Sequence, residues 1–345
     1  MNKRIRKLRG GGDLGGFHID YSNIISKENL FFAWKEFKKG KMTKQDVLTF
    51  SDTAEQNLLY LHETLHQKKY RHSAYTTFIL CDPKRRIINK ASVADRIIHH
   101  AIVRVIEPFY EKRFIHRSYA SRKSKGLHKG VKELRRMMLA VTRNDTRKAY
   151  YLKCDIKKFF DSVDHDILKD ILQKNIRDQD ILDLLVGIID SFHTEDRKGL
   201  PLGNYTSQLF ANMYMNELDQ YIKRVLRIKH YIRYSDDFVI LGSSKKELIG
   251  ILEKIKVFLN EKLHLRLHKE KIFLNQLLKG IDFLGYVVFP HHMVLRTRTK
   301  KRMYRKFKKN PNAESLASYI GMTKHAYSNN IRRDLLKIYF EYKKK

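Results

Sequence analysis

The chain has 345 residues, with 71 lysines and arginines against 37 aspartates and glutamates, so its formal charge is +34. This excess predicts a polyanionic partner, with nucleic acid ahead of a membrane surface, because the basic residues are spread along the chain rather than gathered on one amphipathic helix. No apolar run is long enough to predict a membrane span, and a soluble protein that is merely basic is the alternative.

The two cysteines and the first residues of the chain bear on the cellular compartment in which we expect the protein. Cys81 and Cys154 have no metal-ligand spacing and are too few for a disulfide framework. They fit a reducing compartment, so we expect a cytoplasmic protein. The start, MNKRIRKLRGGGDLGG, is basic and rich in glycine without an apolar stretch. It predicts a flexible tail that touches phosphates rather than a signal peptide.

The first part of the chain predicts helices interrupted by one hairpin. Residues 27–66 have apolar positions at helical spacing, and residues 93–114 predict an amphipathic helix that ends near Glu107-Pro108. Between them, YTTFILCDPKRRII predicts two strands around a turn centred on Pro83. A further helix is predicted from VKELRRMMLAVTRN.

The second part alternates strands and helices. A strand is predicted in YYLKCDIKKFF, a Gly/Pro loop in KGLPLGNYTS, a hairpin in YIRYSDDFVIL, and short strands in LRLHKEKIFL and IDFLGYVVF. Helices are predicted at residues 164–176, 178–192, 208–226 and 245–263, and a very basic tail follows from about residue 291. This order predicts an α+β fold, in which helices pack on one face of an antiparallel sheet, as in ferredoxin-like folds.

Three aspartates predict a metal site. Asp155 ends one predicted strand, and Asp236 and Asp237 lie at the turn of the hairpin. Adjacent antiparallel strands would bring the three carboxylates to one edge of the sheet, where such hard oxygen ligands select Mg²⁺. Two Mg²⁺ ions about 3.5–4 Å apart can clamp the attacking and leaving oxygens of a phosphoryl transfer. Taken alone, Asp236-Asp237 would also suit a solvated turn.

These motifs resemble those of reverse transcriptases. YSDDFVIL resembles their Y-x-D-D hairpin, DIKKFFDSVDH and GLPLGNYTSQLFANMYMNELD the first two palm motifs, and KEKIFL and IDFLGYVVF the two motifs after the hairpin. PKRRIINKASVADRIIHHAI and SYASRKSKGLHKGV resemble the fingers blocks. The resemblance implies a right-hand polymerase. It would have an N-terminal region and fingers (1–148), a ferredoxin-like palm (149–289, with helices 165–198 inserted) and a short helical thumb (290–345).

The residues of the second palm motif resemble those of one class of reverse transcriptases in particular. Most reverse transcriptases carry Gln-Gly and Ser-Pro there, whereas this chain has Leu202-Gly203 and Ser207-Gln208. The form LGxxTSQLFAN is similar to reverse transcriptases of diversity-generating retroelements. That similarity implies error-prone cDNA synthesis from a template-repeat RNA (mutagenic retrohoming), the element's own structured RNA, and an oligomeric accessory variability protein. A retron- or group II intron-like reverse transcriptase and a non-enzymatic basic RNA-binding protein remain alternatives.

The resemblance also implies roles for single residues at the chemical step. Asp155, Asp236, Asp237 and the backbone carbonyl of Ile156 would hold two Mg²⁺ ions, with Mn²⁺ as a substitute. The substrates would be an RNA template, a DNA or RNA primer and deoxynucleoside triphosphates (dNTPs). Lys271 would lie near the leaving pyrophosphate as a general acid, with Lys269 as its rival.

Other residues would contact the incoming dNTP. Lys84 and Arg86 would meet its triphosphate, unless they form only a basic turn in solvent. Phe160 would exclude a ribose 2′-hydroxyl, and either Phe160 or its neighbour should point inward, because successive strand residues alternate faces. Gly203 would let the backbone approach the nucleotide. Leu202 cannot hydrogen-bond as glutamine could, which would lower fidelity; neutral drift is the alternative.

Overall fold

The computed structural model describes residues 20–82 and 84–343, which form two compact units. Unit 1 joins the described chain up to Lys112 to residues Asp164–Ser207, and unit 2 joins Arg113–Val163 to the described chain from Gln208 onward. The flexible tail predicted for residues 1–16 and Pro83 lie outside the described residues. Within those residues, we find no helix with the length and apolar character needed to cross a membrane.

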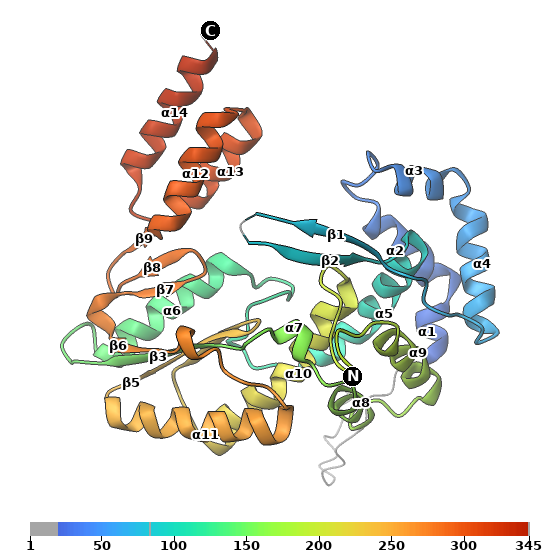
Figure 1. Cartoon of the computed structure of the whole chain (residues 1–345), viewed down its shortest axis with the longest axis horizontal. Coiled ribbons are helices and arrows are strands. Elements are labelled where there is room, and N and C mark those ends of the chain that lie inside the picture. The colour runs from blue at the N-terminus through green and yellow to red at the C-terminus, as the bar shows by residue number, and fades with distance from the viewer. Residues whose placement is uncertain (1–19, 83, 344–345) are drawn as a thin grey trace, which may run out of the picture. The chain divides into compact units, whose positions relative to one another are not determined.

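Unit 1 is mainly helical (Figure 1), and its longest helix, α5 (Val93–Glu111), has buried residues on all sides. Ile97, Ile98, Ile102 and Ile106 of this helix are fully buried. The Ser92 hydroxyl caps its first turn by accepting a hydrogen bond from the Asp95 amide. The other helices are α1 (Tyr21–Ile25), α2 (Lys27–Phe37), α3 (Gln45–Asp52), α4 (Ala54–His66), α8 (His165–Gln173) and α9 (Gln179–Asp190).

The helices predicted in residues 27–66 are present, whereas the predicted end of α5 needs correction. Residues 27–66 form α2, α3 and α4, and the first break between them contains Gly40, whose φ of +66° does not fit an α-helix. The helix expected to end near Glu107-Pro108 instead continues to Glu111. Pro108 lies in its last turn, where Ile106 and Tyr110 on either side are buried and hold the helical path.

A two-stranded hairpin completes unit 1. Strands β1 (Thr76–Leu80) and β2 (Arg86–Lys90) pair antiparallel, with Leu80 opposite Arg86. The strands predicted around residue 83 are therefore present. All five residues of β1 are exposed, although Phe78, Ile79 and Leu80 are apolar.

Unit 2 contains a four-stranded antiparallel sheet with strand order β4-β5-β3-β6 (Figure 1). The hairpin predicted in residues 231–241 is formed by β4 and β5. Strand β3 lies between β5 and β6, and its last residue, Asp155, faces Asp237. The strands are β3 (Tyr150–Asp155), β4 (Tyr231–Tyr234), β5 (Asp237–Gly242) and β6 (Phe273–Gln276).

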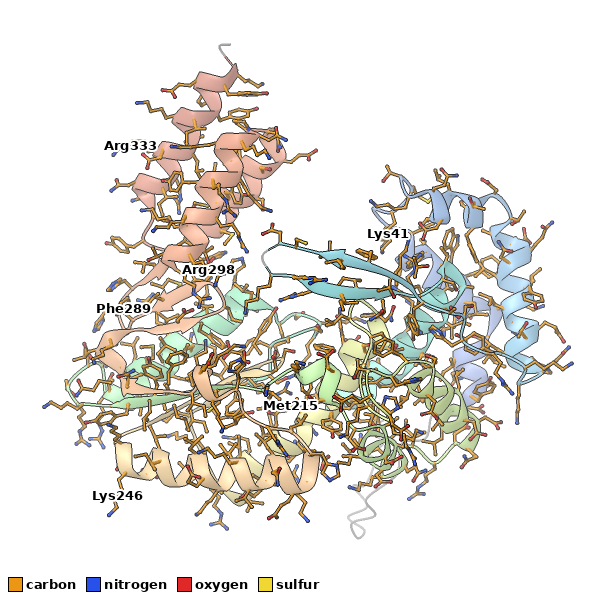
Figure 2. The ribbon with its side chains drawn as sticks, in the orientation of Figure 1. Lys41, Met215, Lys246, Phe289, Arg298 and Arg333 are labelled. Carbon is orange, nitrogen blue, oxygen red and sulfur yellow. The ribbon has the colours of Figure 1, made fainter. Side chains whose placement is uncertain are left out.

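Helices cover both faces of this sheet, so the prediction of helices on one face only is wrong. Helix α6 (Leu127–Thr142) packs on the face that carries Tyr151, Val239 and Leu241, and α11 (Lys245–Leu263) lies on the other face (Figure 1). The apolar run in β5 explains this, because a strand buried on both faces lacks an alternating pattern. Figure 2 shows Lys246 near the start of α11.

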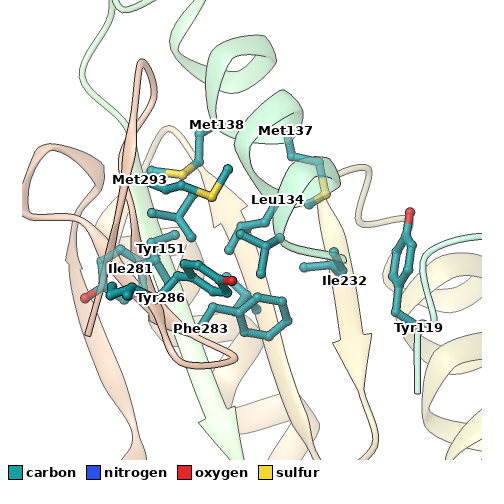
Figure 3. Close-up of a cluster of buried hydrophobic side chains, with 14 of the residues drawn as sticks. Tyr119, Leu134, Met137, Met138, Tyr151, Ile232, Ile281, Phe283, Tyr286 and Met293 are labelled. Atoms are coloured by element: carbon teal, nitrogen blue, oxygen red, sulfur yellow. The ribbon is translucent and has the colours of Figure 1, made fainter. Parts of the chain in front are cut away.

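The core above the sheet is a cluster of aromatic, aliphatic and methionine side chains (Figure 3). Leu134, Met137 and Met138 of α6 meet Ile232 of β4 and Phe283 there. Helix α10 (Tyr205–Gln220) belongs to unit 2 from Gln208 onward and continues as a π-helical turn, Tyr221–Val225.

A small second sheet and three helices end the chain. Residues 281–289, expected to form one strand, form a hairpin whose turn residues Leu284 and Gly285 both have positive φ, as the twist of a two-residue hairpin favours. Of the strand expected at 265–274, only the end enters β6, after a 3₁₀ turn at Lys269–Lys271. The remaining elements are α7 (Phe159–Ser162), β7 (Ile281–Phe283), β8 (Tyr286–Val288), β9 (Met293–Leu295), α12 (Thr297–Lys309), α13 (Ala313–Thr323) and α14 (Asn329–Lys343).

Candidate active site

The three predicted aspartates lie at one edge of the unit 2 sheet. Asp155 is the last residue of β3 and faces Asp237, the first residue of β5. Asp237 also faces Tyr234 of β4, so Ser235 and Asp236 form a two-residue turn. The Ile156 amide donates to the Asp236 carbonyl at 3.3 Å, which ties this turn to the end of β3.

Burial makes this edge unfavourable for negative charge. It raises the pKa of Asp237 to about 7, although the ammonium of Lys153 opposes the rise. Burial, and then the charge of Asp155, raise the pKa of Asp236 above its ordinary value. Oδ1 of Asp237 is buried and has no hydrogen-bond partner among the described residues. Such a cluster favours the approach of a cation.

Two lysines supply positive charge at this edge. Lys271 donates from Nζ to Oδ1 of Asp155 at 2.6 Å, whereas its predicted rival Lys269 is exposed. Nζ of Lys153 lies 3.2 Å from Oδ2 of Asp237 and donates to the Asp282 carbonyl at 2.6 Å. Sequence reasoning missed Lys153. The available signal was its place two residues before Asp155 on one strand, which puts both side chains on the same face.

The carboxylates match the donor chemistry of a hard divalent cation. Their oxygens are the ligands that Mg²⁺ prefers, and the partnerless Oδ1 of Asp237 is a buried acceptor that a cation would satisfy. Within residues 20–82 and 84–343, however, no three His, Cys, Asp or Glu side chains are grouped so that they could hold a metal ion. Lys271 and Lys153 each contact one of the carboxylates instead. The metal-ligand roles of Asp155, Ile156, Asp236 and Asp237 thus stay a prediction.

Phe160 follows the carboxylate edge in the chain. Phe159 and Phe160 begin the short helix α7, with ring centroids 5.4 Å apart. Phe159 is buried and Phe160 is half-buried, so one ring of the two does point inward. The reason given from the sequence is wrong, because these residues are helical and not part of a strand.

The other predicted nucleotide contacts belong to unit 1. Lys84 and Arg86 are exposed beside the β1–β2 connection, and Arg86 is the first residue of β2. The carbonyl of Leu202 accepts from the Asn89 amide at 3.3 Å. Gly203 has φ of +108°, and an added Cβ would lie 3.1 Å from Cγ2 of Ile88. Glycine therefore suits this position, and the nucleotide roles of these residues stay predictions.

Known proteins that are similar to this chain align with it over only part of its length and of their own. Protein YkfC of Escherichia coli is 26% identical over 255 residues, which cover 63% of this chain and 65% of YkfC. The group II intron-encoded protein LtrA of Lactococcus lactis is 23% identical over 287 residues, which cover 64% of this chain and 46% of LtrA. This chain therefore spans about half to two thirds of the length of these curated relatives.

A solved structure and a family profile complete the comparison. The structure of apo telomerase from Candida Tropicalis, truncated from its C-terminal domain, has a TM-score of 0.48 and 14% identity over 70% of this chain and 60% of that one. The profile described as reverse transcriptase (RNA-dependent DNA polymerase) matches residues 68–288, well over half of the chain. This chain belongs to the reverse transcriptase family.

Proposed function

We propose that this chain is an RNA-directed DNA polymerase of a diversity-generating retroelement, which makes error-prone cDNA from a template-repeat RNA. The observation that carries the polymerase proposal is the placement of Asp155 opposite Asp237, with Asp236 in the turn beside them. Within a reverse transcriptase family chain, this buried, acidic sheet edge is the place for nucleotidyl transfer.

The chain's residues would act on the primer end and the incoming dNTP. The primer 3′-hydroxyl loses its proton to water and its oxygen attacks the α-phosphorus. The bond from that phosphorus to the oxygen that bridges to the β-phosphorus breaks, and pyrophosphate leaves. Asp155, Asp236, Asp237 and the Ile156 carbonyl would hold divalent cations, which supply charge neutralisation for the attacking and leaving oxygens. Lys271 would donate a proton to the pyrophosphate, since it already lies at this edge through Asp155.

Further residues would hold the incoming nucleotide. Lys84 and Arg86 would bind the triphosphate, and Leu202 and Gly203 would form the loop under the nucleotide. The hydrogen bond between the Leu202 carbonyl and the Asn89 amide supports a fixed loop backbone. Phe160 would exclude ribonucleotides, which is consistent with its partial exposure.

The retroelement subclass rests on the second palm motif, Leu202-Gly203 and Ser207-Gln208. Under this proposal the partners are the element's own structured RNA and an oligomeric accessory variability protein. LtrA is named for a group II intron, so an intron-like or retron-like reverse transcriptase is the second candidate. Both candidates share the chemistry and differ in the RNA and in fidelity.

Primer extension tests both the proposed polymerase activity and the proposed retroelement subclass. The chain and its Asp236→Asn variant are given an RNA template, a primer, Mg²⁺ and four dNTPs, and the product is sequenced. We expect product from the unmodified chain alone, with changes concentrated opposite template adenine. An accurate product supports the intron-like or retron-like candidate. If neither this assay nor a repeat with native RNA and accessory protein gives product, the polymerase proposal is wrong.

A further inference from the structure

A buried ion pair joins the β4–β5 hairpin, which carries Asp236 and Asp237, to α10. Arg233, on β4, has 1% of its side chain exposed, and Asp219, on α10, has 0% exposed. Nε and Nη2 of Arg233 donate to the two carboxylate oxygens of Asp219 at 2.8 and 2.6 Å, which makes a two-pronged contact. The Tyr231 hydroxyl also donates to Oδ1 of Asp219, at 2.7 Å.

The rest of the guanidinium reaches the turn and its neighbours. Nη1 of Arg233 donates to the Ser235 carbonyl at 3.0 Å and to Oδ1 of Asn212 at 3.3 Å. Nη2 donates to the Ser118 hydroxyl at 3.4 Å. Together with the contacts to Asp219, these give an acceptor to each of the five N–H groups of the guanidinium.

Stability alone does not explain this pair. Removing two charges from water costs so much that well-packed apolar residues of similar volume often stabilise a core at least equally. The pair also differs from a surface ion pair in that one of its donors holds a backbone carbonyl in the turn. The pair therefore also bears on the geometry of the turn.

The turn needs such support because its first residue is strained. Ser235 has φ of +57°, a region that favours glycine, at the position where two-residue hairpin turns often require glycine. Arg233 holds the Ser235 carbonyl, and the Ile156 amide holds the carbonyl of the next residue, Asp236. The carbonyls of both turn residues are thereby fixed, one by a buried side chain and one by the amide of Ile156, which directly follows β3.

We propose that Arg233, anchored by Asp219, is a positioning residue for nucleotidyl transfer: it fixes the Ser235 carbonyl and so sets the direction of the Asp236 carboxylate. Its catalytic consequence rests on the proposed polymerase function. Its structural consequence, a rigid turn, is measurable without catalysis. Neither residue has to touch substrate for this role.

The test replaces the charged network with apolar side chains. The triple variant Arg233→Met, Asp219→Leu, Tyr231→Phe leaves no charge or hydroxyl of the three unpaired. Its matched control is Arg96→Met with Asp46→Leu, which removes from unit 1 the ion pairs of Asp46 with Arg96, at 2.5 Å, and with Lys90, at 2.7 Å. Arg233→Lys is the conservative variant, because it keeps the positive charge but cannot make the two-pronged contact of the guanidinium.

Two readouts are measured on each protein. In primer extension, we expect kcat of the triple variant to fall about 100-fold, as for a misplaced catalytic group, with KM for dNTP changed less than about threefold. Arg233→Lys should fall between this variant and the unmodified chain. In hydrogen exchange, we expect the amides of residues 235–237 to exchange at least about tenfold faster in the triple variant. The control should change neither readout.

The outcomes separate the two proposals. If the unmodified chain makes no product, the polymerase proposal fails and hydrogen exchange alone decides the positioning role. A folded triple variant with unchanged exchange at residues 235–237, or with unchanged kcat in an active enzyme, overturns it. An equal loss of kcat in the Arg96 control also overturns it. Should the triple variant not fold, Arg233→Lys carries the same two measurements, and unchanged values there contradict the proposal.

Discussion

Phe159 and Phe160 are adjacent in α7, yet only the first is fully buried. We expect Phe160→Ala to admit ribonucleotides, because it removes the ring proposed to clash with the 2′-hydroxyl. The ratio of ribonucleotide to deoxynucleotide incorporation should rise roughly 100-fold. Single-nucleotide extension with rATP against dATP measures this ratio.

Phe159→Ala is the matched control for Phe160. It truncates the buried ring and should lower the free energy of unfolding by about 3–5 kcal/mol through the cavity it leaves. It should leave the sugar ratio unchanged. If Phe160→Ala leaves the ratio unchanged, or Phe159→Ala raises it equally, then Phe160 does not select the sugar.

Leu202 gives the second prediction at the scale of single residues. Glutamine at this position could hydrogen-bond near the nucleotide sugar, and such a bond is worth about 1 kcal/mol net, or roughly fivefold in selection. We therefore expect Leu202→Gln to lower misincorporation opposite template adenine by about fivefold. Leu202→Met, of similar volume and without a donor, should keep the original error rate. Sequencing of extension products decides, and an unchanged error rate for Leu202→Gln means that Leu202 does not set fidelity.

At the scale of elements, α5 carries a buried histidine that makes unit 1 sensitive to acid. Burial, and then the charge of His72, lower the pKa of His99 to about 3, while nearby Asp95 opposes the shift. Above pH 6.5 His99 is neutral in both the folded and the unfolded chain, so it does not lower the free energy of unfolding. As the pH falls below 6.5, the unfolded chain binds the proton and the folded chain does not, so stability is lost down to about pH 3.

We expect His99 to lower the free energy of unfolding of unit 1 by about 2 kcal/mol at pH 5 relative to pH 7. Fluorescence of Trp34, the single tryptophan, reports unfolding of unit 1 in urea at both pH values. His99→Phe should remove this part of the loss, whereas His66→Gln, at an exposed position on α4, should not. Equal losses in His99→Phe and the unmodified chain would contradict the assignment.

Helices and strands were predictable where the pattern of apolar and polar residues within the segment itself determines the structure. The apolar runs on both sides of the polar break at Asp236-Asp237 predicted the β4–β5 hairpin, and the pairing of β3 with β5 then places Asp155 beside it. The end of α5 was not predictable, because proline disfavours a helix interior but burial of Ile106 and Tyr110 overrides it. Partners from distant elements, such as Arg233 and Asp219, leave no periodic signal and appeared only in the fold.

At the scale of the whole molecule, the charge of +34 does not identify the surface that binds nucleic acid. Helix α12 is the best candidate in unit 2. Met303 and Phe307 are buried on one side, while Lys301, Arg305 and Arg298, which Figure 2 labels, are exposed. A helix anchored by two apolar residues and presenting a row of cations suits contact with a phosphate backbone.

We expect Arg298→Gln, Lys301→Gln and Arg305→Gln together to weaken binding of an RNA–DNA primer–template and to make that binding less dependent on salt. Losing three phosphate contacts should reduce the magnitude of the slope of log K against log salt concentration by about 3. The control is Lys245→Gln, Lys246→Gln and Lys254→Gln on α11, which removes the same charge from exposed positions elsewhere in unit 2. Fluorescence anisotropy across a salt series gives both slopes. Because a nonspecific field depends on total charge, equal changes in the two variants would show that α12 is not a distinct binding surface.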